Sequence, residues 1–458
     1  MNNRKVKLGF FGGAGSVTGS NFLLESDKLK IIIDCGLFQE TLDIKGKNSD
    51  PFPFNPKEID FVFITHGHLD HIGRLPKLVK DGFQGKIFST SETKEISRLI
   101  LEDALKVMGY KKEEKNPIYS EKDLIKTFEL WSTLSYEENF NLGDEIKVSL
   151  KNSGHILGSA MVEFQFKGSP GSLVFTGDLG NWPNPLLKKA EIPHDVRYLV
   201  MESVYGDRNQ ESAGERDKKF KEVVKKVIGN GGVLLIPSFS LERAQVILFE
   251  INKLVEKGEI PTVPVFFDSP LAIKLTEIYK NSTHLFNEEV QELIKKGDDI
   301  FSFPGLSISR KAYQSKAIYE IPGPKIIIAG SGMSQGGRII FHEAEYLPDE
   351  KNAVLLVGYQ AVGTLGRSLE EGAKEVVIEG QKVPVRAKVE HLDGFSAHKD
   401  SEALLEFVSE SGEYLEKVFL AMGEPKASLF LSQRIRDYLG VSSVAPKEGD
   451  TFELDFGE

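Results

Sequence analysis

The first 200 residues alternate short apolar runs with polar turns, which is typical of β-strands. Residues 59–64 form an aromatic and β-branched run and therefore predict a buried strand. Further strands are predicted at 6–11, 21–25, 30–34, 146–150, 161–166 and 173–175. From Ser91 onward, apolar residues recur at helical spacing and predict a helix. The first part of the chain is therefore expected to be rich in sheet, with helices between the strands.

The middle of the chain changes to an alternation of helices and buried strands. An amphipathic helix is predicted at 220–228. The buried strands predicted after it lie at 232–237, 263–267, 325–329 and 353–357. This alternation indicates a parallel sheet covered by helices. Alternating strand returns at 383–389, and a strand at 418–421 and a final helix at 428–439 are predicted to complete the chain.

Length and composition indicate a soluble protein with two domains. A chain of 458 residues exceeds one ordinary domain, and 40% hydrophobic with 27% charged residues is usual for a globular protein. No apolar run approaches the ~20 residues that span a bilayer, and no export signal is apparent at the start. The single cysteine, Cys35, excludes an intrachain disulfide. We therefore expect a cytoplasmic protein without a membrane partner.

The net charge of −11 argues against a broadly basic surface for binding nucleic acid. It leaves open a locally basic cleft, particularly where metal ions supply the positive charge.

Four potential metal ligands follow the strand at 59–64 within six residues: His66, His68, Asp70 and His71. Alternating side chains in this loop can point at two neighbouring places. We expect His66 and His68 to share one metal, and Asp70 and His71 to face a second. Imidazole and carboxylate suit zinc or a similar divalent ion. The simpler alternative, a histidine-rich surface loop, is disfavoured because three of only nine histidines fall here.

Three more candidate residues, Asp34, His155 and Asp178, each follow an apolar run and are flanked by glycine. Any one of them alone would be a turn residue more often than a ligand. Together with the histidine cluster they resemble the metallo-β-lactamase superfamily, whose sequence motifs occur in this order.

Two further stretches narrow the resemblance. Residues 201–208 look like the first signature of the β-CASP nucleases, and residues 394–400 look like their second. Supporting matches lie at 268–272, 330–338 and 357–367. The resemblance covers essentially the whole chain and is to bacterial and archaeal relatives of the endonuclease subunit of the mRNA 3′-end cleavage and polyadenylation factor.

The resemblance implies a four-layer αββα metallo-β-lactamase core with an inserted α/β β-CASP domain. The core would comprise residues 1–205 and 383–458, and the β-CASP domain residues 206–382. The implied activity is that of a metal-dependent ribonuclease, which hydrolyses RNA phosphodiester bonds at a zinc centre in the cleft between the domains. Single-stranded RNA is the expected substrate, and a homodimer is compatible with the resemblance.

The resemblance also assigns a role to each candidate ligand. His66, His68 and His155 would hold one zinc, and Asp178 would bridge to a second. The second zinc would be held by Asp70, which is counted with the catalytic residues, and by His71. Asp34 would orient the ligand imidazoles by hydrogen bonding.

Three further residues would act on the substrate. His398 would protonate the leaving oxygen, and Glu202 would hold His398 in orientation. Ser396 would hydrogen-bond the scissile phosphate.

One position departs from the family pattern. The third signature has a histidine before Gly-Glu that completes the second zinc site, and Met422 stands there in this chain. A thioether is a soft ligand, poorly suited to zinc beside carboxylates. We therefore expect one tightly bound zinc and a weaker second metal, for which Mn²⁺ is an alternative. His391 could substitute for the missing ligand, but a surface histidine is the simpler interpretation.

Two rival functions stay open at this point. The first is hydrolysis of another phosphodiester or ester substrate by the same metal centre. The second is a catalytically weakened family member that binds RNA. The complete histidine cluster disfavours the second alternative, because degenerate family members lose ligands there.

Overall fold

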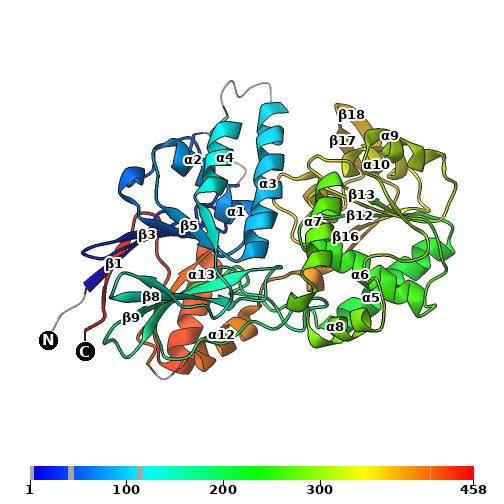
Figure 1. Cartoon of the computed structure of the whole chain (residues 1–458). Helices are drawn as coiled ribbons and strands as arrows, with labels where there is room; N and C mark the ends of the chain where they lie inside the picture. Colours follow the sequence, from blue (N-terminus) through cyan, green and yellow to red (C-terminus); the bar gives the residue numbers. More distant parts are fainter. Residues whose placement is uncertain (1–4, 40–45, 111–116, 413, 458) are drawn as a thin grey trace. The chain divides into compact units, whose positions relative to one another are not determined.

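The computed structural model describes the whole chain except residues 1–4, 40–45, 111–116, 413 and 458. It contains two compact units (Figure 1). The first unit comprises residues 1–209 and 397–458, and the second comprises residues 210–396.

Two seven-stranded sheets form the centre of the first unit. One contains, in spatial order, β22 (Thr451–Asp455), β1 (Lys5–Phe10), β2 (Phe22–Glu25), β3 (Lys30–Ile33), β4 (Phe61–Phe63), β5 (Lys86–Ser89) and β6 (Trp131–Thr133). The other contains β21 (Ser442–Val444), β20 (Lys417–Ala421), β11 (Val196–Glu202), β10 (Ser172–Phe175), β9 (Ala160–Phe166), β8 (Ile146–Asn152) and β7 (Phe140–Leu142).

The two sheets pack face to face, with helices on both outer faces. Phe63 of β4 meets Phe164 of β9 with ring centroids 5.7 Å apart, in a core cluster drawn from both sheets. Val62, the neighbour of Phe63, points to the opposite face and joins the cluster under the helices α1 (Leu69–Ile72), α2 (Leu75–Lys80), α3 (Ser91–Tyr110) and α4 (Glu121–Glu129). Helices α12 (Ser401–Glu410) and α13 (Pro425–Arg434) cover the second sheet (Figure 1). The predicted αββα core is confirmed.

The end of the chain differs from the prediction. The final helix is α13, continued by a π-helical turn to Leu439, and two strands follow it. Strand β22 pairs antiparallel with β1, so the last segment extends the first sheet at its edge. The prediction that a helix completes the chain was wrong, because Phe452 and Leu454 alternate with polar residues as in a strand.

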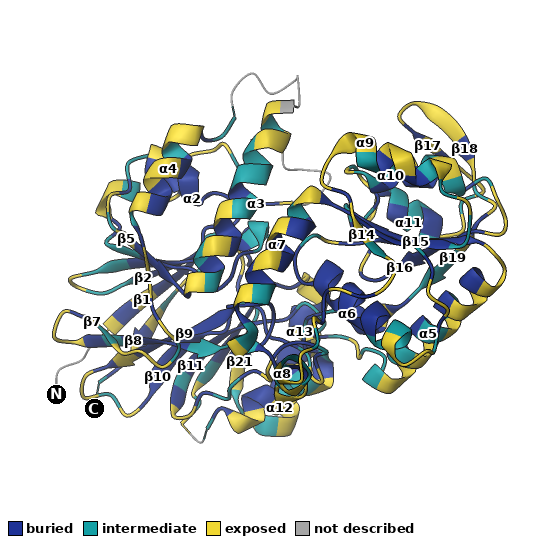
Figure 2. Ribbon diagram, turned by 45° about the vertical axis from the view of Figure 1, so that its right-hand side comes forward, coloured by how far each residue is buried: buried dark blue, intermediate teal, exposed yellow. Residues whose placement is uncertain are grey.

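The second unit contains a six-stranded sheet in which every pairing is parallel. Its order is β14 (Leu306–Ile308), β13 (Val265–Asp268), β15 (Lys325–Ala329), β12 (Val233–Pro237), β16 (Ala353–Leu356) and β19 (Lys388–His391). The helices are α5 (Ala213–Gly229), α6 (Arg243–Glu256), α7 (Pro270–Asn281), α8 (Glu288–Lys295), α9 (Ala312–Ala317), α10 (Ile339–Tyr346) and α11 (Leu365–Glu370). The central strands are buried throughout (Figure 2). This confirms the predicted parallel sheet covered by helices.

The second unit extends further along the chain than the expected boundary at residue 382. Residues expected as one strand at 383–389 divide between β18 (Gln381–Pro384), which forms a hairpin with β17 (Glu375–Ile378), and β19. Because β19 pairs with β16, the chain up to Ser396 packs with the second unit. At the other end the first unit continues to residue 209, beyond the expected 205.

Within the described ranges, no helix is both long and apolar enough to cross a membrane.

Candidate metal centre

The histidine cluster lies where β4 ends and α1 begins. His66 follows the strand by three residues, His68 is the N-cap of α1, and Asp70 and His71 lie in its single turn. His66 and His71 are completely buried. Gly67 is required here, because a Cβ at this position would lie 2.6 Å from Cγ2 of Ile96.

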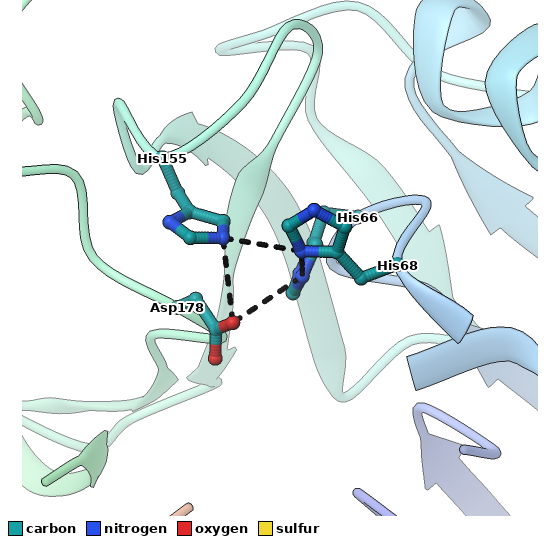
Figure 3. Close-up of side chains that lie close together, drawn as sticks. All are labelled: His66, His68, His155 and Asp178. Carbon is teal, nitrogen blue, oxygen red and sulfur yellow. Dashed lines mark hydrogen bonds and ion pairs between the residues drawn. The ribbon is translucent and has the colours of Figure 1, made fainter. Parts of the chain in front are cut away.

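Four side chains converge on one point (Figure 3). One ligand atom from each of His66, His68, His155 and Asp178 lies within 4.8 Å of the others. Oδ2 of Asp178 is 3.4 Å from Nε2 of His66 and 3.4 Å from Nε2 of His155. Nδ1 of His68 lies 3.0 Å from Nε2 of His66 and 3.2 Å from Nε2 of His155. The arrangement joins ligands from a β4 loop with ligands that follow β8 and β10.

Two of these side chains favour the protonation state that a metal requires. Burial lowers the pKa of His68 and of His155 well below the ordinary value of 6.5. Neutral imidazoles carry a lone pair, and the metal-binding form of histidine is the neutral one. The donor set of three imidazoles and one carboxylate therefore fits a zinc ion.

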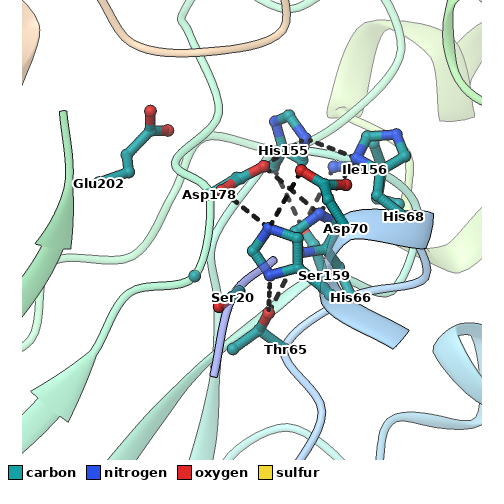
Figure 4. A network of polar contacts seen from close by, with 12 residues as sticks. Ser20, Thr65, His66, His68, Asp70, His155, Ile156, Ser159, Asp178 and Glu202 are labelled. Atoms are coloured by element: carbon teal, nitrogen blue, oxygen red, sulfur yellow. Dashed lines mark hydrogen bonds and ion pairs between the residues drawn. The ribbon is translucent and has the colours of Figure 1, made fainter. Parts of the chain in front are cut away.

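His71 approaches the other carboxylate oxygen of Asp178, and the side chain of Asp70 lies close to the same group (Figure 4). Nε2 of His71 lies 3.3 Å from Oδ1 of Asp178 and 3.9 Å from Oδ2 of Asp70. Within the part of the chain that the structure describes, the buried atoms His71 Nε2 and Asp178 Oδ1 make no hydrogen bond. Burial lowers the pKa of His71, but the surrounding carboxylates outweigh burial and raise it well above 6.5. Carboxylates that favour a proton here would equally favour a bound cation, so these residues fit a second metal.

Asp34 lies behind the ligands and is completely buried. Its Oδ2 is 2.7 Å from Nδ1 of His71, and its Oδ1 accepts a 2.8 Å hydrogen bond from the Thr65 amide. A carboxylate at Nδ1 leaves Nε2 of His71 with the lone pair that a metal needs. Asp34 is therefore placed as it would have to be to orient the His71 imidazole by hydrogen bonding.

Sequence reasoning missed two hydroxyl groups of this network. Oγ1 of Thr65 lies 2.9 Å from Oδ2 of Asp34 and 3.1 Å from Nδ1 of His66, and Ser20 donates to the same carboxylate at 3.1 Å. The position of Thr65 directly before His66 was an available signal. No such signal was available for Ser20, because it lies in a turn far from His66 in the sequence.

Glu202 and His398 meet beside the same group. Glu202 ends β11, and both of its carboxylate oxygens lie 3.1 Å from Nδ1 of His398. Its Oε1 also accepts a 2.6 Å hydrogen bond from the Leu179 amide, one residue after Asp178. Burial lowers the pKa of His398, but the charge of Glu202 and its hydrogen bond outweigh burial and raise the pKa to about 9. His398 therefore carries a proton at neutral pH, as a general acid requires.

Two of the predicted positions lie in the second unit. Ser396 follows a short 3₁₀ turn, and its amide donates to the Asp393 carbonyl at 3.1 Å. His391 lies 2.8 Å from a carboxylate oxygen of Glu370 and 3.3 Å from one of Asp393. Both ring nitrogens of His391 thus already face carboxylates of the second unit, which disfavours the alternative that His391 binds zinc. The phosphate-binding role of Ser396 stays a prediction.

Met422 follows β20 and is buried in the core cluster between the two sheets. Its backbone has a φ of 44°, and its amide donates to the Gly13 carbonyl at 2.6 Å. Sδ packs so closely on Gly13 that a Cβ there would lie 2.4 Å from the sulfur. The thioether thus makes apolar contacts with the glycine turn that follows β1.

Comparison with known proteins gives matches along most of the chain. Residues 23–195 match a metallo-beta-lactamase superfamily domain, residues 244–369 a Beta-Casp domain, and residues 382–446 a Zn-dependent metallo-hydrolase RNA specificity domain. The fold and this site thus define a metal-dependent hydrolase of the metallo-β-lactamase type. Within that superfamily, the chain belongs to the β-CASP family.

Relatives with descriptive names cover nearly the whole chain. It is 37% identical to Ribonuclease TTHA0252 of Thermus thermophilus, over 92% of this chain and 94% of the relative. It is 32% identical to the transcription termination factor FttA of Methanosarcina mazei, over 98% of this chain and 72% of the relative. The RNase J-like protein of Methanocaldococcus jannaschii is 31% identical, over 97% of this chain and 99% of the relative.

A solved structure of a protein of unknown function from Enterococcus faecalis V583 superposes with a TM-score of 0.57. It is 12% identical and covers 98% of this chain and 100% of its own, which shows similarity of fold alone.

Proposed function

We propose that this protein is a metal-dependent ribonuclease that hydrolyses phosphodiester bonds of single-stranded RNA at a zinc centre. The observation that carries the proposal is the convergence of His66, His68, His155 and Asp178 beside the hydrogen-bonded pair of His398 and Glu202. The ribonuclease relative and the RNA specificity domain support RNA as the substrate.

The ligands divide into two sets that share Asp178. His66, His68 and His155 would hold the first metal, and the pair Asp70 and His71 would hold the second. A pair of metal ions in such a site supplies Lewis-acid stabilisation of the phosphate oxygens and lowers the pKa of the attacking water. Asp34 keeps His71 in the orientation that this binding requires.

The protein's own proton transfer takes place at His398. Because its Nδ1 is held by Glu202, its Nε2 is the nitrogen that delivers a proton to the leaving oxygen. Glu202 keeps the ring oriented and stabilises its protonated form. The leaving oxygen would otherwise depart as an unprotonated alkoxide, which is a poor leaving group.

The two metals should differ in affinity. The first set has four converging ligands, whereas the second has Asp70, His71 and the shared Asp178, with Met422 packed on Gly13. Oxygen ligands form the majority in the second set, so Mn²⁺ should bind there as well as zinc.

The proposal is tested by cleavage assays on the purified full chain, before and after removal of metal by chelation. The substrates are single-stranded RNA, duplex RNA, single-stranded DNA and a panel of small phosphodiesters and carboxylic esters. We expect metal-dependent cleavage of single-stranded RNA. Hydrolysis of small esters without cleavage of RNA would establish the rival metallo-hydrolase. RNA binding without cleavage would establish a weakened family member.

A homodimer and a cytoplasmic location stay predictions of the sequence. Light scattering on the purified protein measures its molar mass in solution and so tests for the homodimer directly.

A further inference from the structure

The two tryptophans of this chain lie in opposite environments. Trp131 is 3% exposed, stacks on Phe128 with ring centroids 5.3 Å apart, and donates its indole N–H to Oγ of Ser89 at 2.9 Å. Trp182 is 45% exposed, although it lies four residues after the metal ligand Asp178. Trp131 is explained by core packing, whereas Trp182 keeps a large aromatic surface in water on the segment that follows Asp178.

Backbone hydrogen bonds hold this segment against the catalytic groups. Gly180 donates to the Ser153 carbonyl at 2.8 Å and forms an antiparallel bridge with His398. The amide of Asn181 donates to the Ala397 carbonyl, also at 2.8 Å. Two residues of extended chain span at most about 7 Å, so the Trp182 backbone lies within that distance of the residue bridged to His398.

The loop that continues from Trp182 is well ordered by its own contacts. Oδ1 of Asn184 accepts hydrogen bonds from the amides of Leu186 and Leu187, both at 2.8 Å. Asn152 holds the far end of the loop, because its side chain donates to the Lys189 carbonyl at 3.0 Å. A side chain at the start of this loop is therefore presented from a fixed backbone.

Two exposed lysines, Lys188 and Lys189, lie on the same loop as Trp182. Proteins that bind single-stranded nucleic acid combine aromatic side chains, on which bases stack, with positive charges that follow the phosphates. This loop carries both features beside the residues assigned to phosphodiester cleavage, in a protein whose overall charge is −11.

We propose that the loop of residues 181–189 is an RNA-binding element, in which Trp182 stacks on a base next to the scissile phosphate. Lys188 and Lys189 attract the neighbouring backbone phosphates. This inference rests on the proposed ribonuclease function and adds a substrate-positioning residue to it. Stacking on the indole is tolerant of base identity, so the contact fixes the position of the strand without selecting a sequence.

Steady-state cleavage of single-stranded RNA by the zinc-loaded full chain tests the role of Trp182. Trp182→Ala should raise KM by about 5- to 100-fold with little change in kcat, because one base–aromatic stack is lost. Trp182→Phe should restore most of the affinity, since a smaller aromatic ring remains. Tyr438→Ala is the matched control, because Tyr438 is an exposed aromatic side chain of the same unit, 72% exposed, and should leave KM unchanged. An unchanged KM in Trp182→Ala would overturn the proposal while leaving the ribonuclease function intact.

Tryptophan fluorescence gives a second readout that does not depend on turnover. In a His398→Ala background, binding of single-stranded RNA should quench the emission of the exposed Trp182. The buried Trp131 should not respond, so the quenching should disappear when Trp182→Phe is added. Quenching that persists in the Trp182→Phe protein would contradict the proposal.

A change of emission on dilution without RNA would instead identify an interface between two copies of the chain. Wild-type protein that cleaves no RNA would refute the proposed function itself.

Discussion

Two buried aspartates, one in each unit, occupy similar positions and have different surroundings. Asp178 follows β10 by three residues, and Asp268 is the last residue of β13. A histidine side chain lies close to each of the two carboxylates. The carboxylate of Asp268 is saturated by Arg338 on one oxygen and by His342 and Ser315 on the other. Oδ1 of Asp178, by contrast, makes no hydrogen bond within the described residues.

The difference separates a structural carboxylate from the carboxylate that we propose as a metal ligand. For Asp268, burial raises the pKa, but hydrogen bonds from His342, Ser315 and Arg338 outweigh burial and lower it. All of its charge is thus compensated by protein groups. Oδ2 of Asp178 lies 3.4 Å from His155, whose pKa burial lowers well below 6.5, so a neutral imidazole with a lone pair stands beside this carboxylate and a cation can be bound between them. A carboxylate at a strand end is therefore a ligand only where its neighbours leave its oxygens unsatisfied.

The largest expected effect comes from Asp178→Ala. We expect RNA cleavage to fall to background and metal to be lost from both sites, because Asp178 is the residue shared by the two ligand sets. Circular dichroism should still show a folded chain. Metal analysis by mass spectrometry measures the loss. A folded Asp178→Ala protein with full metal content and normal activity would refute the site assignment.

His398→Ala should slow cleavage by about 10²- to 10⁴-fold, which is the usual contribution of a positioned general acid. Its metal content should equal that of the wild type, since His398 is assigned to proton transfer and not to either ligand set. Single-turnover kinetics and metal analysis on the same preparation check both statements. Reduced thermal stability with an unchanged rate would indicate a structural histidine.

Asp268→Ala should act in the opposite way to Asp178→Ala. Removing this carboxylate leaves Arg338 and His342 without their buried partner, which should destabilise the second unit by about 3–5 kcal/mol. The metal content should be unchanged, because the ligands belong to the first unit. Urea unfolding with metal analysis makes the measurement. Loss of metal from the folded Asp268→Ala protein would remove the distinction between the two aspartates.

A smaller effect should come from Glu343, a carboxyl of the second unit that has one hydroxyl partner among the residues that the structure describes. Ser334 donates to Glu343 at 2.5 Å, and burial raises the pKa of this carboxyl from 4.5 to about 8. Between these values the folded chain keeps a proton that the unfolded chain has lost, so stability should fall as pH rises from about 4.5 to 8. Glu343→Gln should flatten this dependence. Urea unfolding across this range tests it, and an equal slope in both proteins would contradict the assignment.

Much of the fold could be predicted from sequence, because apolar spacing reports directly on burial. The run at 59–64 and the alternation after residue 220 identified the strand that carries the histidines and the parallel sheet of the second unit. Strand β22 was missed although Phe452 and Leu454 alternate with polar residues, because its pairing with β1 joins segments more than 440 residues apart. The second unit runs to Ser396, past the expected boundary at residue 382, because β19 pairs with β16.

The candidate site was predictable only in part. Histidine spacing, flanking glycines and the family resemblance singled out Asp178 and not Asp268, although both follow apolar strands, but they did not reveal the physical cause of the difference. What separates them is the set of partners that the fold supplies. The hydroxyls of Ser20 and Thr65 belong to the same class of unpredicted partners.

The most direct test is anomalous diffraction at the zinc absorption edge, from crystals of protein purified without added metal. We expect one strong peak at about 2.0–2.1 Å from the ligand nitrogens of His66, His68 and His155, next to Asp178. A weaker peak should lie between His71 and Asp70, and its height should rise when crystals are soaked in zinc. Two peaks of equal height before soaking would show that Met422 does not weaken the second site. No peak among the three histidines, even after soaking, would contradict the metal centre itself.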